Sequence, residues 1–121
     1  MNKDGFTLIE VLAALSILAF GLLALAGLQV TSVHGNFFSN NVTQATVLAQ
    51  DRLEQLENLP WDDAALGSGH HNDGAITDSI FSRQYAVADT TSTMKRITVT
   101  VQWTDRVDHN IKLSTIRYRP Q

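Results

Sequence analysis

The stretch that decides the fold is VLAALSILAFGLLALAGL, residues 11–28, in which no side chain carries a charge. A helix of these eighteen residues nearly spans a bilayer, at about 1.5 Å per residue against a hydrocarbon core of about 30 Å. Its flanks are also apolar, so we predict a membrane helix over residues 6–33. A secretory signal peptide is not favoured, because residues 29–32, QVTS, offer no small-residue cleavage site after the apolar run.

Glu10 lies at the edge of this apolar segment, and no charged residue follows it before Asp51. An unpaired charge buried in hydrocarbon is costly. Glu10 therefore either lies among lipid headgroups or pairs with a cation. Lys3 and the terminal amine are the positive groups that precede the span, so the N-terminus is expected in the cytoplasm.

The helical pattern continues beyond the membrane segment. Apolar residues recur at spacings of three and four and form an amphipathic stripe: Val42, Ala45, Ala49, Leu53, Leu56 and Leu59. The opposite face is polar: Gln44, Asp51, Arg52, Glu54, Gln55 and Glu57. Pro60 ends the pattern. We predict one helix over about residues 6–59, weakest at Gly35-Asn36, since glycine lowers helix stability by about 1 kcal/mol relative to alanine.

The rest of the chain predicts a loop and three strands. Residues 60–81 are rich in Gly, Asp, Ser and Asn, which is typical of a loop. Alternating residues predict antiparallel strands over 83–88, 95–104 and 111–118, with a polar hairpin turn at 105–110. The residues expected on the inward faces are Tyr85, Val87, Ile97, Val99, Val101, Trp103, Ile111, Leu113 and Thr115.

A three-stranded sheet with one apolar face needs a cover to be stable. The amphipathic helix over residues 36–59 is the element available for this. The predicted fold is therefore α+β: one long N-terminal helix whose C-terminal half packs on a small three-stranded antiparallel sheet. The predicted parts are the membrane segment, residues 6–33, and a head, residues 34–121.

Composition limits the function further. The 121 residues suit one small domain, and without cysteine they offer no disulfide, thiolate metal site or cysteine nucleophile. The net charge of -3 is the sum of -7 over residues 1–82 (two basic, nine acidic) and +4 over residues 83–121 (seven basic, three acidic). Either the acidic and basic faces are each simply solvated, or copies of the chain stack with opposite charges facing each other.

The sequence GFTLIE, residues 5–10, followed directly by an apolar helix, resembles the processing motif of type IV prepilins and type II secretion pseudopilins. The resemblance implies that a prepilin peptidase cuts between Gly5 and Phe6, removes residues 1–5 as a leader peptide and N-methylates Phe6. Glycine has no side chain, so a peptidase can close on the backbone before the bond. The resemblance also implies that Glu10 pairs with the terminal amine of a neighbouring subunit; the alternative is that Glu10 only caps its own helix.

The segment ILAFGLLALAGLQ, residues 17–29, resembles PilV-type minor pilins, which are type IV pilus modification proteins. Residues 48–60, 95–105 and 111–120 are similar to the same branch. The resemblance implies a minor pilin, without enzymatic activity or cofactor, that primes or modifies pilus assembly. Its expected partners are prepilin peptidase, major and minor pilin subunits and inner-membrane lipid. Its expected location is the inner membrane, as a single-pass precursor, and then the pilus at the cell surface or the periplasm.

Two other classes remain open. One is a minor pseudopilin of a type II secretion system, which shares the processing motif. The other is a single-pass membrane-anchored module that binds a ligand, such as DNA, and never polymerises.

Histidines and aspartates near the middle of the chain suggest a metal site: His70, His71, Asp62, Asp63 and Asp73. Adjacent histidines cannot both coordinate from one helix face, and the ligands lack the spacing of a known set. We therefore interpret them as a solvated loop and expect no bound metal.

Basic residues interleaved with Trp103 and Tyr118 suggest a nucleic-acid surface: Arg83, Lys95, Arg96, Arg106, Lys112, Arg117 and Arg119. We interpret them instead as a charged sheet edge that discourages sheet-to-sheet pairing, so nucleic acid is not an expected partner. His34 and His109 are predicted to be polar surface residues, and Trp61 is predicted to pack at the end of the long helix. Ser, His and Asp occur without a nucleophile-elbow sequence, so catalysis is not expected.

Overall fold

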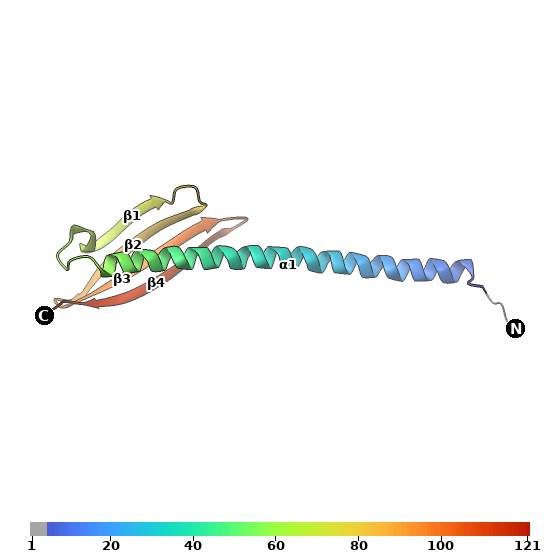
Figure 1. Cartoon of the computed structure of the whole chain (residues 1–121), viewed down its shortest axis with the longest axis horizontal. Coiled ribbons are helices and arrows are strands. Elements are labelled where there is room, and N and C mark those ends of the chain that lie inside the picture. Colours follow the sequence, from blue (N-terminus) through green and yellow to red (C-terminus); the bar gives the residue numbers. More distant parts are fainter. Residues whose placement is uncertain (1–4) are drawn as a thin grey trace. The chain divides into compact units, whose positions relative to one another are not determined.

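The computed structural model describes residues 5–121, so the first four residues of the expected leader, with Lys3 and Asp4, lie outside the described part. The chain divides into two compact units, Met1–Ser39 and Asn40–Gln121. The helices are α1, Leu8–Glu57, and the short 3-10 helix η1, Ala64–Leu66. The strands are β1, Gly69–Ala75, β2, Phe81–Thr91, β3, Met94–Thr104, and β4, Asp108–Tyr118 (Figure 1).

Helix α1 confirms the predicted long helix, with each end two residues inside the predicted bounds of 6–59. It is continuous through Gly35 and Asn36, so the expected weak point does not interrupt it. At its C-terminal end, the N–H of Asn58 still donates to the carbonyl of Glu54 at 3.1 Å. Pro60 has no N–H with which to continue the pattern, and the helix stops.

The sheet is antiparallel, with the strands in the order β1-β2-β3-β4. The three predicted strands are confirmed as parts of β2, β3 and β4. Because β4 begins at Asp108, the predicted hairpin turn over residues 105–110 is shorter than expected. His109 therefore lies in a strand, half-buried, with its ring stacked 5.2 Å from that of Trp103, and the prediction of a polar turn residue is wrong.

Strand β1 corrects the predicted loop over residues 60–81, and the sheet has four strands rather than three. The sequence GHHNDGA has low strand propensity and no apolar alternation, so local pattern does not predict it. It forms a strand because it pairs along β2, with a bulge that leaves Asp73 as an extra residue between Asn72 and Gly74. Gly74 has a φ of 79°, which favours glycine, and its N–H donates to Asn72 Oδ1 at 2.8 Å.

Within residues 40–121, one face of the sheet and the buried side of α1 form the hydrophobic core (Figure 1). The inward faces predicted for β2 and β3 are confirmed, and those of β4 are half-buried, as suits an edge strand. Ala45 and Ala49 of α1 are fully buried, and their small side chains let the helix backbone lie near the strands. The fully buried Leu66 of η1 closes the end of the core. The C-terminal half of α1 therefore covers the apolar face of the sheet, as the sequence predicts.

Candidate processing and assembly site

The start of α1 is fixed by Thr7. The Thr7 hydroxyl accepts a hydrogen bond from the N–H of Glu10 at 3.2 Å, and the Thr7 carbonyl accepts one from the N–H of Val11 at 3.1 Å. Thr7 is therefore the N-cap, and Glu10 is the third residue of the helix. The spacing Thr-x-x-Glu is the sequence signal of a capping box, and this signal would have placed the helix start at Leu8 rather than at Phe6.

Gly5 and Phe6 precede the helix and are exposed. The side chain of Phe6 is 82% exposed. The peptide bond that joins them lies outside the hydrogen-bonded turns, where an enzyme can reach it. A Cβ atom placed on Gly5 would meet no atom within 4 Å. Nothing in the described residues requires glycine at position 5, so any such requirement comes from a partner that closes on this backbone.

Glu10 is exposed in the first turn of α1, where its charge suits the positive end of the helix dipole. Its carboxylate has no hydrogen-bond or ion-pair partner among residues 5–121 of the structure. Beside it lies a shallow hollow of 410 Å³, lined otherwise by Phe6, Val11, Ala14, Leu15 and Leu18. The first turns thus present one carboxylate next to an apolar depression.

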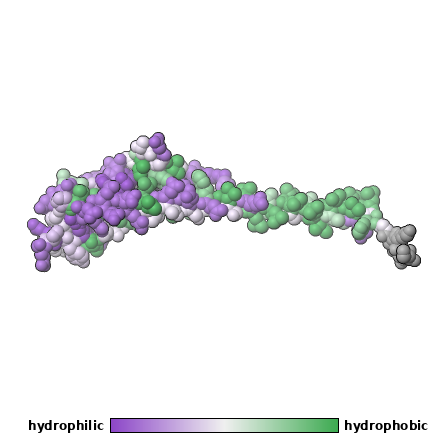
Figure 2. Space-filling model, in the orientation of Figure 1, coloured by the Kyte–Doolittle hydropathy of each residue, from purple (hydrophilic) through white to green (hydrophobic). Residues whose placement is uncertain are grey.

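The following turns of α1 expose an apolar surface. Every residue from Gly5 to Asn40 is exposed, and an 18-residue window of the helix has a mean hydropathy of 2.5. Figure 2 shows the N-terminal turns of the helix as a mostly hydrophobic surface. Among the described residues, α1 is the one helix long and apolar enough to cross a membrane. Water is a poor solvent for such a surface, which needs lipid or other helices around it.

Residues 1–26 match the prokaryotic N-terminal methylation motif. This motif indicates a type IV pilin-like or pseudopilin protein. It implies processing by a prepilin peptidase and assembly with other pilins, and with the apolar helix it fits a single-pass inner-membrane precursor. No curated protein and no solved structure matched the chain.

The histidines considered for a metal site point to opposite faces of β1. His71 lies over the ring of Tyr85, with ring centroids 4.6 Å apart, and its Nε2 is 2.8 Å from the carbonyl of Gly67. His70 lines a hollow on the other face of the sheet. Asp63 accepts a hydrogen bond from the N–H of Ala65 at 2.8 Å and caps η1. Within residues 5–121, no group of three or more His, Asp or Glu could hold a metal ion.

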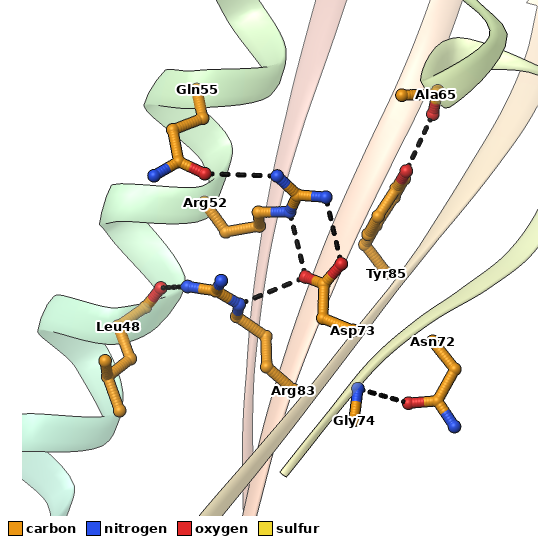
Figure 3. A network of polar contacts seen from close by, with 9 residues as sticks. All are labelled: Leu48, Arg52, Gln55, Ala65, Asn72, Asp73, Gly74, Arg83 and Tyr85. Atoms are coloured by element: carbon orange, nitrogen blue, oxygen red, sulfur yellow. Dashed lines mark hydrogen bonds and ion pairs between the residues drawn. The ribbon is translucent and has the colours of Figure 1, made fainter. Parts of the chain in front are cut away.

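Asp73 instead joins β1 to α1 (Figure 3). Its carboxylate meets Arg52 through two contacts, Oδ2 to Nε at 2.8 Å and Oδ1 to Nη2 at 2.9 Å. Oδ2 also lies 3.1 Å from Nε of Arg83, whose Nη1 donates to the carbonyl of Leu48 at 3.1 Å. The side chain of Arg52 was expected on the solvated face of the helix. The bulge at Asp73 brings it into a network that holds the edge strand against the helix.

Tyr85 lies beside this network. Its hydroxyl donates to the carbonyl of Ala65 at 2.9 Å, and the guanidinium carbon of Arg52 is 5.0 Å from the ring centroid (Figure 3). Burial raises the pKa of Tyr85 above its usual 10.0, and the nearby charge of Arg52 opposes that rise. The neutral phenol is therefore the form that the folded head prefers.

Three of the seven basic residues considered for nucleic-acid binding donate to main-chain carbonyls inside the head. Besides Arg83, Nζ of Lys95 donates to the carbonyls of Trp61 and Leu66 at 3.2 and 3.1 Å. Arg117 donates to the carbonyl of Leu56 at 3.0 Å and to that of Leu59. The bonds of Arg117 reach carbonyls at the end of α1, and those of Lys95 reach carbonyls of Trp61 and of Leu66 in η1.

Lys95 and Arg117 also contact the ring of Trp61. Its ring lies 4.7 Å from Nζ of Lys95 and 6.0 Å from the guanidinium carbon of Arg117, directly after the end of α1. This confirms the packing predicted for Trp61.

Proposed function

We propose that the chain is a minor pilin of a type IV pilus, a non-enzymatic subunit that primes or modifies pilus assembly. The N-terminal methylation motif, the exposed Gly5-Phe6 bond and the unpaired Glu10 beside it support this proposal. The likeness of residues 17–29 to PilV-type minor pilins supports the finer assignment. The single observation that carries the proposal is the placement of an open peptide bond one helical turn before a lone carboxylate.

In the proposed first step, prepilin peptidase hydrolyses the bond between Gly5 and Phe6. One water is added, Gly5 keeps a carboxylate and Phe6 gains an amine. A methyl group then passes from a methyl-sulfonium donor to that amine, with loss of a proton and release of the thioether. Thr7 supports this step because its cap begins the helix at Leu8 and leaves the Gly5-Phe6 bond outside the helix.

In the proposed second step, the apolar half of α1 leaves lipid and packs among the helices of neighbouring subunits. Lipid tails are as apolar as leucine, so burying this surface against other helices gives little net hydrophobic gain. Polar contacts therefore decide the position of the incoming subunit. Glu10 and the new amine of a neighbour each carry a charge that is costly when alone in a low dielectric, and pairing offsets both costs.

Mass spectrometry of the mature N-terminus tests this proposal. An N-methylated Phe6 is expected, and an intact Met1 would support the membrane-anchored module instead. Gly5→Val should block cleavage. Gly35→Val is the matched control, because a Cβ at either glycine meets no atom within 4 Å, and it should be processed normally. Mature-sized Gly5→Val protein would overturn the proposal.

The location of the mature chain separates the pilus from the secretion pseudopilus. A minor pilin is expected in pili sheared from the cell surface. Recovery of the processed chain only with the cell envelope, together with loss of protein secretion when the chain is deleted, would favour the pseudopilin.

A further inference from the structure

Two opposite surfaces of the head carry charges of opposite sign that are unpartnered among the described residues. Within residues 40–121, the outward side of α1 carries Asp51 and Glu54, whose carboxylates have no hydrogen-bond or ion-pair partner in the described structure. The face of the sheet turned away from α1 carries Arg96 and Lys112, which are exposed and equally without a side-chain partner there. The internal cations Arg83, Lys95 and Arg117, by contrast, all have partners.

The sheet face turned away from α1, here called the open face, is uncovered and lined mainly by polar side chains. Both α1 and η1 pack on the other side of the sheet. One hollow of 380 Å³ on the open face is lined by Gln84, Thr98, Gln102, Asn110 and Lys112, among others. A second hollow of 380 Å³ lies near the β3–β4 turn and includes Asp108, whose carboxylate accepts a hydrogen bond from the hydroxyl of Thr104. Thr100, at the centre of the open face, is only 8% exposed. In the hollow that Lys112 lines, a carboxylate-bearing surface would meet hydrogen-bond donors and positive charge.

The acidic residues of α1 form a ridge along the exposed side of the helix, here called the acidic ridge. Gln50, Asp51 and Glu54 follow one another at helical spacing on the exposed side of α1, opposite the buried Ala45 and Ala49. A helix ridge that carries carboxylates complements a hollowed sheet face that carries ammonium and guanidinium groups.

We propose that the open face of one head binds the acidic ridge of α1 from a second copy of this chain. Each copy offers one surface of each kind, so the contact is head-to-tail and does not close on itself. Repetition of such a contact generates an open helical row rather than a dimer. The inference rests on the proposed filament role, in which neighbouring heads are brought together, and it adds the two surfaces that meet.

The contact is expected to be weak alone, since exposed ion pairs each contribute little and are screened by salt. Anchoring the helices in one membrane or one filament raises the effective concentration of the heads, so a weak contact suffices. This predicts association that falls as salt is raised, and that depends on charge at both surfaces.

The absence of cysteine in the chain permits a direct test. Gln50→Cys and Asn110→Cys are combined in the full-length chain in cell membranes and treated with a short bismaleimide crosslinker. A ladder of dimers, trimers and higher species is expected, because each copy carries both thiols. Pairing Gln50→Cys with Ser92→Cys, in the exposed turn between β2 and β3, is the matched control and should give no ladder.

Charge reversal then tests the cause of the ladder. Arg96→Glu with Lys112→Glu should reduce it about threefold or more, and adding Asp51→Lys with Glu54→Lys should restore it. Arg119→Glu, the same change outside the open face, should leave it intact. If a reversal lowers the amount of protein, Arg96→Gln with Lys112→Gln gives the same comparison.

Three results would overturn the proposed contact: no ladder, a ladder insensitive to charge and salt, or crosslinks to other proteins alone. Cleavage at Gly5 is scored separately by the size of the chain. A processed protein without a ladder refutes the head contact alone, whereas an unprocessed protein that forms a ladder refutes the processing step alone.

Discussion

Asp73 and Arg52 join the edge strand to the helix through a hydrogen bond from Nη2 to Oδ1 at 2.9 Å and an ion-pair contact between Nε and Oδ2 at 2.8 Å. The two side chains are 21 residues apart in sequence. Both are about one-fifth exposed, so the pair is partly shielded from water. A two-point contact of this kind is stronger than a single ion pair and fixes the relative position of both groups.

Replacing Asp73 by Asn should lower the free energy of unfolding of the head by about 2 kcal/mol. Asparagine keeps the shape but removes the charge that Arg52 and Arg83 share. Fluorescence of Trp61 and Trp103, which both lie in the head, reports the unfolding of the full chain in detergent. Asp62→Asn, at an exposed residue, is the control, and an equal effect of the two variants would contradict the proposed role of Asp73.

Arg117→Leu should loosen the end of α1. The guanidinium donates to the carbonyls of Leu56 and Leu59. Its loss removes the bond to the Leu59 carbonyl, whereas the Leu56 carbonyl still accepts from the N–H of Leu59 at 3.4 Å, and the expected cost is about 1–3 kcal/mol. Hydrogen exchange should become faster for amides in the last turn of α1. Arg119→Leu removes a neighbouring positive charge that makes no such bond, and it should leave exchange there unchanged.

The head should lose stability at high pH because of Tyr85. Burial raises its pKa in the folded state above 10.0, so the stabilisation is complete below that pH and is lost as pH rises through the folded-state pKa. Tyr85→Phe should cost about 1 kcal/mol at neutral pH through the lost bond to Ala65. The variant should also show a smaller loss above pH 10 in the same fluorescence assay. An unchanged alkaline profile would assign the loss to another group.

Thr7→Ala should weaken the start of α1 by about 1 kcal/mol, since the cap bond to the N–H of Glu10 disappears. Faster hydrogen exchange is expected at the first turn of the full chain in detergent micelles. Thr7→Ser keeps the hydroxyl and should restore slow exchange. Equal exchange in all three proteins would show that the cap bond does not stabilise this end.

Glu10→Ala should leave cleavage intact but reduce incorporation into sheared pili by about tenfold or more, because an amine of the neighbour would then be left unpaired. Glu10→Asp keeps the charge and should recover part of the incorporation. Immunoblots of sheared and cellular fractions measure both steps. Normal recovery of Glu10→Ala in pili would count against the pairing.

The elements that depend on local pattern could be predicted from the amino-acid sequence. An uncharged run of helical length, a stripe ending at Pro60 and strict alternation around Val99 predict the helix and the three apolar strands, because hydrophobic periodicity follows the geometry of each element. The motif at residues 5–10 was sufficient to identify Gly5, Phe6 and Glu10 as candidates. The cap at Thr7 was also within reach, through its spacing from Glu10.

Only the tertiary structure decided the features that join distant residues. Strand β1 has no apolar pattern of its own and forms because its backbone pairs with that of β2. The bulge in β1 places Asp73 in contact with Arg52. The bonds of Arg117 to the carbonyl of Leu56 at the end of α1, and of Lys95 to the carbonyl of Trp61, equally join segments about 30 to 60 residues apart. From the local sequence alone, a charged residue is expected to be exposed to solvent. Whether it contacts a main-chain carbonyl or an opposite charge depends on how distant segments pack together, and local pattern does not show this.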